Sequence, residues 1–267
     1  MSPSSPGPVA ILSALPEEVN HLVTDRLAAD LERPEQISLA TKSAWRGTLG
    51  GHDVVIALSG MGKVAAALVA TSLIEITRPR VLVFSGVAGG LDPALDVGDV
   101  VIAERVVQHD TGILTDRGLQ RYQPSHLPFI NPTDEFGSAC DPTLVELGVA
   151  AATSAALETL PAPAGGRGHA PRVTTGVVAT GDVFVNGDAI RRRLFEDLGA
   201  HAVEMEGGAV AQVADALGVP HLIVRAIADK ADDDSNVDFN QFTELAALNS
   251  ARIVEQVAAA LSANNAA

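Results

Sequence analysis

The chain has 267 residues, with 18 Lys or Arg against 33 Asp or Glu, so its formal net charge is −15. An acidic chain without a basic cluster argues against nucleic acid or an anionic membrane as the main partner, because phosphate binding needs clustered Lys and Arg. The single cysteine, Cys140, excludes an internal disulfide framework and a cysteine-rich zinc site.

The first residues of the sequence do not have the pattern of a secretory signal. Residues 1–8 lack the basic and apolar parts of a secretory signal, and no apolar run approaches the roughly 20 residues of a membrane helix. We therefore expect an intracellular, cytoplasmic protein. Residues 1–8 and 262–267 are typical of flexible tails, which leaves one domain over 9–261. Residues 161–171 have the composition of an exposed loop within it.

Apolar runs and helical spacings alternate along this domain. Buried strands are predicted at 9–14, 81–84, 100–107, 173–180, 202–205 and 221–228, and antiparallel strands within 37–59. Helices are predicted at 17–31, 63–76, 142–160, 189–198, 208–217 and 242–261. This alternation predicts an α/β layered sheet, in which ligands bind at the carboxyl ends of strands.

Familiar phosphate and dinucleotide motifs are incomplete in this sequence. The run at 60–63 lacks the earlier glycine of a phosphate loop, and Val64 stands where Ser or Thr would be. The glycines of 86–90 do not have dinucleotide spacing, and the seven histidines lack metal-ligand spacing. These motifs therefore assign no function.

Acidic residues stand at the ends of three predicted strands: Glu17 and Glu18, then Glu204 and Glu206 around Met205, and Asp229 after a strand containing Arg225. Each has a structural explanation of its own. Acidic side chains favour helix N-termini, a strand end can lie on the surface, and a buried Arg needs an anionic partner. Alternation along a strand predicts Glu204 and Glu206 on one side and Met205 on the other.

Together, the three groups suggest glycosidic hydrolysis. One carboxyl group would protonate the leaving group and another would activate water, and negative surroundings favour the cation-like transition state. A third carboxylate could hold a ribose diol. Phe184, on a loop bounded by Gly181 and Gly187, is either a wall for a purine or an ordinary core residue.

In the segments that carry these residues, and in several others, the sequence resembles the 5′-methylthioadenosine/S-adenosylhomocysteine nucleosidases of the nucleoside phosphorylase superfamily. The matching segments follow the family's order from about residue 9 to 261. They are LPEEV (15–19), SGMGKVAA (59–66), GVAGGL (86–91), VGDV (97–100), HD (109–110), GDVFVNG (181–187), VEME (203–206) and VRAIAD (224–229).

The resemblance implies a single-domain, three-layer α/β fold with a mixed, partly barrel-like sheet flanked by helices. It implies hydrolysis of adenine nucleosides substituted at the 5′ position, such as methylthioadenosine, S-adenosylhomocysteine and 5′-deoxyadenosine. It implies no metal and no organic cofactor. It also implies a homodimer in which a partner loop helps to close the substrate pocket.

By position, the resemblance gives catalytic roles to Asp229, as the acid at purine N7, and to Glu18, which positions and deprotonates water with help from Arg225. Glu206 would hold the ribose hydroxyls. The other expected substrate contacts are Met205 under the sugar, Phe184 and Val185 at the purine, Ala88 and Gly89 beside them, and Met61 and Phe239 at the 5′ group.

The chain departs from the family pattern at Val87, where Ser or Thr is usual, and at Ala228, where Ser is usual. It also has Gly207-Gly208 where pairs containing Ala or Thr are common. Because Val87 cannot donate a side-chain hydrogen bond, we expect water positioning to depend on Glu18 and Arg225. Residues 111–138 match poorly, so they do not define the 5′ group.

Three alternative functions stay open. A phosphorylase of the same superfamily would need a cationic cradle, whereas Glu17 and Glu18 would repel phosphate. A hydrolase for futalosine-type or inosine-like nucleosides would release another base. A non-catalytic nucleoside-binding protein would use the same carboxylates without turnover.

Overall fold

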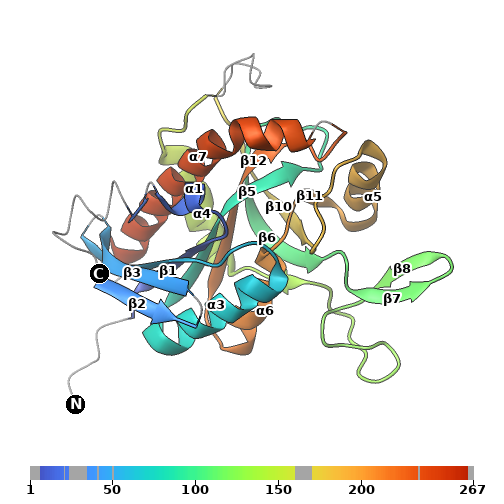
Figure 1. Cartoon of the computed structure of the whole chain (residues 1–267), viewed down its shortest axis with the longest axis horizontal. Helices are drawn as coiled ribbons and strands as arrows, with labels where there is room; N and C mark the ends of the chain where they lie inside the picture. The colour runs from blue at the N-terminus through green and yellow to red at the C-terminus, as the bar shows by residue number, and fades with distance from the viewer. Residues whose placement is uncertain are drawn as a thin grey trace.

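A mixed ten-stranded sheet lies at the centre of this computed structural model, with helices around it (Figure 1). The structure describes residues 7–20, 22–23, 35–40, 42–49, 51–159, 170–233 and 235–263, without the side chains of 235–241 and 262–263. Strands from both sides of residues 160–169 share this sheet. No helix in the described ranges is long and apolar enough to cross a membrane.

The strands begin and end as follows: β1 (Val9–Ser13), β2 (Glu35–Leu39), β3 (Lys42–Leu49), β4 (His52–Leu58), β5 (Val81–Gly90), β6 (Val100–Gln108), β7 (Gly112–Thr115), β8 (Gly118–Arg121), β9 (Ser138–Ala139), β10 (Val173–Thr180), β11 (Ala200–Glu204) and β12 (His221–Asp229). The helices are α1 (Pro16–Asn20), α3 (Lys63–Thr77), α4 (Pro142–Ser154), α5 (Asp188–Leu198), α6 (Gly207–Ala216) and α7 (Ser235–Ala263).

Five strands of the sheet close into a barrel. The sheet order is β11-β10-β6-β12-β5-β1-β4-β3-β2, and β11 also pairs antiparallel with the end of β5, at Gly89 and Gly90. A Cβ at Gly90 would lie 3.2 Å from Ile227, so the absent side chain lets β5 continue between its neighbours. The expected mixed, partly barrel-like sheet is therefore confirmed.

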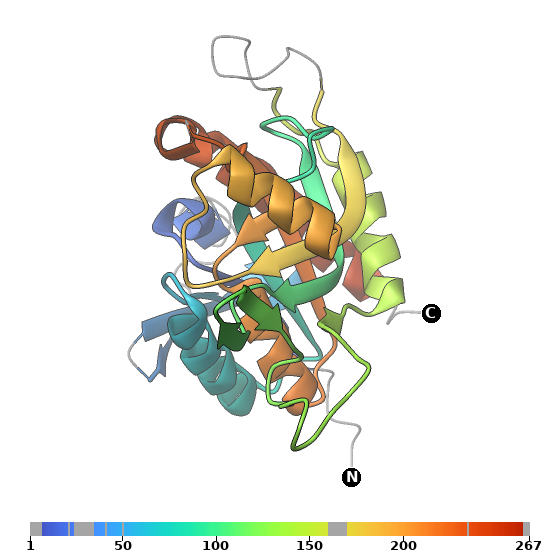
Figure 2. The same ribbon diagram turned by 90° about the vertical axis from the view of Figure 1, so that its right-hand side faces the viewer.

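Two groups of helices cover the sheet. Helix α7 packs on β5 and β12 and also contacts α1 and α4, whereas α3 and α6 pack against each other. In Figure 2, α3 and α6 lie below while α4 lies along the right side. Because helices cover both sides, β5 and β12 are buried at every residue and are apolar almost throughout.

The predicted elements agree with the observed ones except in a few places. β5 runs six residues beyond the predicted end, through 85–90, because a buried strand tolerates glycines where neighbouring chains approach closely. Helix α4 ends at Ser154 rather than 160, and α7 begins at Ser235 rather than 242. The small strands β7, β8 and β9 were not predicted, and 24–31 of the predicted helix 17–31 lie outside the described residues.

Candidate active site

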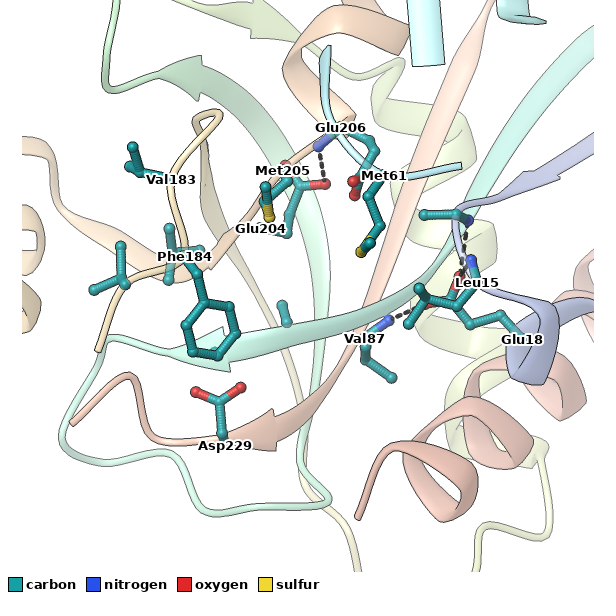
Figure 3. A pocket seen from close by; sticks show the side chains of 15 residues that line it. Leu15, Glu18, Met61, Val87, Val183, Phe184, Glu204, Met205, Glu206 and Asp229 are labelled. Atoms are coloured by element: carbon teal, nitrogen blue, oxygen red, sulfur yellow. Dashed lines mark hydrogen bonds between the residues drawn. The ribbon is translucent and has the colours of Figure 1, made fainter. Parts of the chain in front are cut away.

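A cavity of about 140 Å³ opens where several strands reach their carboxyl ends. Its walls come from the segments that follow β1, β4 and β10, from the second half of β5, and from the ends of β11 and β12. Three carboxyl groups predicted for the site, those of Glu18, Glu206 and Asp229, line it together (Figure 3). The sheet topology thus brings distant sequence segments to one place, as expected for this class of fold.

Glu18 is held by three backbone N–H groups at one end of the cavity. Oε2 accepts hydrogen bonds from Ala14 and Leu15, both at 2.8 Å, and Oε1 accepts one from Val87 at 2.9 Å. The side chain is 3% exposed. Burial raises the pKa of Glu18, while the charge of Arg225 and the three hydrogen bonds oppose that rise. Such a fixed carboxyl group is suited to taking a proton.

Asp229 is the last residue of β12 and is 2% exposed. Its Oδ1 accepts a hydrogen bond from the backbone N–H of Ala231, at 2.8 Å. A Cβ at Gly89 would lie 2.8 Å from the same oxygen, so the glycine makes room for the carboxyl group. In Figure 3, Asp229 lies below the Phe184 ring, away from Glu18.

Glu206 precedes α6 and is 5% exposed. Its Oε1 accepts a hydrogen bond from the backbone N–H of Gly62, at 2.7 Å. Burial, followed by the charge of Glu204, raises the pKa of Glu206 to about 7. The carboxyl group therefore titrates close to neutral pH.

Arg225 lies behind the cavity rather than in its wall. Its Nη2 pairs with Oε2 of Glu204, and its guanidinium carbon lies 4.1 Å from the centroid of the Phe84 ring. The structural Arg–carboxylate pair that the sequence left open is therefore present. A Cβ at Gly86 would overlap both Arg225 and Glu18, so the arginine is packed next to the carboxyl group it was predicted to assist.

Glu204 was not among the predicted site residues, although it belongs to the predicted acidic pair. Besides Arg225, it accepts hydrogen bonds from the hydroxyl of Thr180 and from the backbone N–H groups of Glu206 (3.0 Å) and Gly207 (2.7 Å). Glu204 comes shortly before the predicted helix 208–217, and acidic side chains favour helix N-termini. This spacing could have indicated that Glu204 binds the first N–H groups of the helix.

The expected substrate-contacting residues mostly gather around the same cavity. The wall includes Ala88, Gly89, Met61, Met205, Phe184 and Val185. Phe184 is 48% exposed and Met61 is 66% exposed. Phe184 is therefore not an ordinary core residue.

Two of the expected residue placements, those of Glu17 and Met205, need correction. A third, that of Phe239, cannot be compared with the structure. Glu17 is exposed and does not line the cavity. Met205 lines it as well as Glu204 and Glu206, because β11 ends at Glu204 and strand alternation stops there. The side chain of Phe239 lies outside the described residues, so its contact stays a prediction.

The sequence matches the phosphorylase superfamily over residues 8–259. With the barrel-like sheet and the site at its strand ends, this places the chain in that superfamily. A 5′-methylthioadenosine/S-adenosylhomocysteine nucleosidase of Mycobacterium bovis is 43% identical over 255 residues, which cover 96% of this chain and 98% of the relative. Within the superfamily, the chain belongs to the 5′-methylthioadenosine/S-adenosylhomocysteine nucleosidases.

Solved structures agree with this assignment. The nucleosidase from Neisseria meningitidis, in complex with methylthio-immucillin-A, has a TM-score of 0.77 and 31% identity, covering 94% of this chain and 98% of its own. A futalosine hydrolase of Helicobacter pylori has a TM-score of 0.76 and 29% identity, covering 94% and 97%. The fold is thus shared by hydrolases of more than one nucleoside.

Proposed function

We propose that this chain hydrolyses the N-glycosidic bond of 5′-substituted adenine nucleosides, with 5′-methylthioadenosine and S-adenosylhomocysteine as substrates. The observation that carries the proposal is a single cavity into which three separate elements bring Glu18, Glu206 and Asp229. Glycosidic hydrolysis needs an acid on one side of the scissile bond and a base on the other. The relatives act on the same class of nucleoside by name.

In the proposed reaction, the protonated carboxyl group of Asp229 donates its proton to N7 of the purine. The bond between C1′ and N9 then breaks, and its electron pair passes to the departing adenine. Water adds to C1′ while its proton passes to Glu18, which gives free adenine and the 5′-substituted ribose. The two carboxyl groups lie apart in Figure 3, which supports separate roles for them.

The remaining residues would hold the substrate. The Glu206 carboxylate would accept hydrogen bonds from both ribose hydroxyls, and Met205 would pack against the sugar. Phe184 would stack on the purine, and the backbone at Val185 would contact the edge of the base. Met61, at the exposed rim of the cavity, would contact the 5′ group, and we place Phe239 there also.

Arg225 would act through its neighbours. Its charge opposes the effect of burial on Glu18 and so favours the ionised base that must accept a proton from water. Val87 contributes its backbone N–H to Glu18 rather than a side-chain hydroxyl. Orientation of the water would therefore depend on Glu18.

Phosphorolysis fits this cavity poorly. Among the described residues that line it, there are four carboxyl side chains and no Lys, Arg or His. A phosphate ion would enter next to Glu18 without a cation in contact with it. This distribution of charge supports water as the nucleophile.

The test is release of free base by the purified protein, with and without added phosphate. The panel is methylthioadenosine, S-adenosylhomocysteine, 5′-deoxyadenosine, adenosine, inosine and futalosine. We expect adenine from the 5′-substituted adenosines without phosphate. Release only with phosphate, or no release from any nucleoside, would contradict the proposal. Preferential cleavage of futalosine would favour the second activity, which the similar Helicobacter pylori hydrolase suggests.

We also propose that two copies of the chain associate. Val64 and Leu68 are one turn apart at the start of α3, Met61 lies just before the helix, and Val64 is 80% exposed. Phe129 and Ile130, between β8 and β9, are 74% and 69% exposed. A second copy would cover these apolar side chains. Light scattering should give twice the chain mass, and Val64→Asp should shift the protein toward monomer.

A further inference from the structure

A ring of hydrogen bonds outside the cavity joins two segments that border it to a third segment, which follows β6 and does not line it. Asp110 follows β6, Lys63 begins α3, and Asp182 lies in the loop 181–187 that carries Phe184. Oδ1 of Asp110 accepts from Lys63 Nζ at 2.6 Å, and its Oδ2 accepts from the backbone N–H of Asp182 at 2.8 Å. Oδ1 of Asp182 accepts from the backbone N–H of Lys63, at 2.7 Å. Each of the three residues is therefore bonded to the other two.

The ring is next to two of the proposed substrate contacts. Gly62, which precedes Lys63, donates its backbone N–H to Glu206. Asp182 is two residues before Phe184 in the same loop. If the start of α3 shifted against this loop, Gly62 would move relative to Glu206, to which it donates a hydrogen bond. The backbone that carries Phe184 would also move.

The Lys63–Asp110 pair of this ring is more buried than an ordinary surface ion pair. Only 18% of the Lys63 side chain and 23% of the Asp110 side chain are exposed. Burial alone would raise the pKa of Asp110, but the hydrogen bonds from Lys63 and Asp182 outweigh it and hold the pKa below its usual value. The carboxylate is therefore charged at neutral pH and accepts two charge-assisted hydrogen bonds.

The loop itself has little apolar packing at its centre. Val183 is 53% exposed and Phe184 is 48% exposed, so hydrophobic burial alone does not fix them. Neither Lys63, Asp110 nor Asp182 lines the cavity, which excludes them as groups that contact the reacting atoms there. What the ring can do is to hold Phe184 and Glu206 in place before substrate arrives.

We propose that Asp110 is a positioning residue for substrate binding, acting with Lys63 and Asp182 to hold the loop 181–187 against the start of α3. The inference rests on the proposed nucleosidase activity and adds to it a residue that touches no substrate. Without the ring, part of the binding free energy would be spent on ordering the loop.

Asp110→Asn tests the proposal, because the amide has a single acceptor oxygen and can accept from Asp182 or from Lys63 but not from both, and the charge facing Lys63 is lost. We expect KM for methylthioadenosine to rise roughly tenfold, with kcat falling less than about threefold. Lys63→Met should have the same effect. Asp53→Asn is the matched control, since it removes the carboxylate of an exposed pair with Arg46, at 2.7 Å and away from the cavity.

The effect must also depend on Phe184. In a Phe184→Ala background, Asp110→Asn should raise KM by less than about twofold, and Lys63→Met should add little to Asp110→Asn. A general loss of structure would instead give additive effects and a lower Tm. An unchanged KM in Asp110→Asn, an equal rise in Asp53→Asn, or additivity with Phe184→Ala would overturn the inference.

Wild-type turnover is measured first, so that the two proposals fail separately. Release of adenine by the wild type with normal KM in Asp110→Asn overturns only the positioning role. No release by the wild type overturns the proposed function. If the wild type releases no adenine, calorimetry can still compare the dissociation constant of methylthioadenosine between the wild type and the variants. The positioning role then predicts roughly tenfold weaker binding by Asp110→Asn.

Discussion

Arg225 and Glu204 form an ion pair in which the two side chains are only 1% and 2% exposed. The pair joins the middle of β12 to the end of β11, and Glu204 also accepts hydrogen bonds from the backbone N–H groups of Glu206, just before α6, and Gly207, its first residue. Two charges that have left water need each other, because the cost of desolvation is recovered only when the pair is intact. The pair therefore supports the end of β12, which carries Asp229, and the turn between β11 and α6, which carries Glu206.

Glu204→Gln is expected to destabilise the protein strongly. The substitution leaves the guanidinium of Arg225 buried without its hydrogen-bonded carboxylate, and breaking a buried pair lowers the free energy of unfolding by about 3–5 kcal/mol. Urea denaturation measures this directly. Asp53→Asn, which breaks an exposed pair, should cost less than about 1 kcal/mol. Equal losses in the two variants would show that burial of the Arg225–Glu204 pair has no energetic consequence.

Asp229→Asn should separate binding from turnover. The amide keeps the size of the side chain and an oxygen for Ala231, but it cannot deliver a proton to the purine. We expect kcat to fall by about 10²–10⁴-fold, with the dissociation constant of methylthioadenosine changed by less than about fivefold. Steady-state turnover gives kcat, and the dependence of the single-turnover rate on enzyme concentration gives the dissociation constant. Turnover close to that of the wild type would remove Asp229 from the proton transfer.

Much of this site could be predicted because local patterns mark the strand ends. Asp229 is the last of nine buried residues in a largely apolar strand, and Glu18 comes just after another such strand. The carboxyl ends of neighbouring parallel strands lie at the same edge of a sheet. Recognising the strands was therefore enough to expect these carboxylates together.

Other features depend on contacts between distant residues and were not predicted. The partner of Arg225 is 21 residues away, and Gly62 reaches Glu206 across 144 residues. The extension of β5 through Gly86 depends on the packing of Glu18 and Arg225 next to it. Sequence periodicity carries no signal for such pairs, since they are set by how the barrel closes.

Gly86→Ala should lower the activity although it removes no polar group from the site. A Cβ at this position would overlap the Glu18 carboxylate and the guanidinium of Arg225, and the fully buried surroundings give neither much room to move. Because a displacement of about 1 Å can cost 10²-fold in rate, we expect at least a tenfold fall in kcat. Methylthioadenosine hydrolysis measures it. Gly187→Ala, in the loop 181–187, is the control. Its Cβ would lie 3.6 Å from the nearest atom, in Asp233, which is an ordinary van der Waals distance. Equal activity in the two variants would contradict this packing argument.

Glu206 should give the activity a pH dependence near neutrality. Burial and the charge of Glu204 raise its pKa to about 7, and the ionised form is the one that can accept hydrogen bonds from both ribose hydroxyls. We expect kcat/KM to rise from about pH 6 to about pH 8, since this quantity reports the free enzyme. In Glu206→Gln this limb should disappear, whereas Glu17→Gln, at an exposed carboxylate outside the cavity, should keep it. A 2′-deoxy substrate should lose less from Glu206→Gln than its ribo counterpart.

The same titration predicts how stability changes with pH. The pKa of Glu206 is higher in the folded protein than the ordinary value of 4.5, so the fold favours the protonated form. Its contribution to stability is therefore complete at low pH and is lost as pH rises from about 4.5 through about 7, by on the order of 3 kcal/mol. Glu206→Gln, which is never charged, should melt at a higher temperature than the wild type at about pH 8 and at a similar temperature at about pH 5. A constant difference in Tm across this range, or one that grows toward acid, would show that Glu206 does not titrate as a buried, raised-pKa carboxyl group.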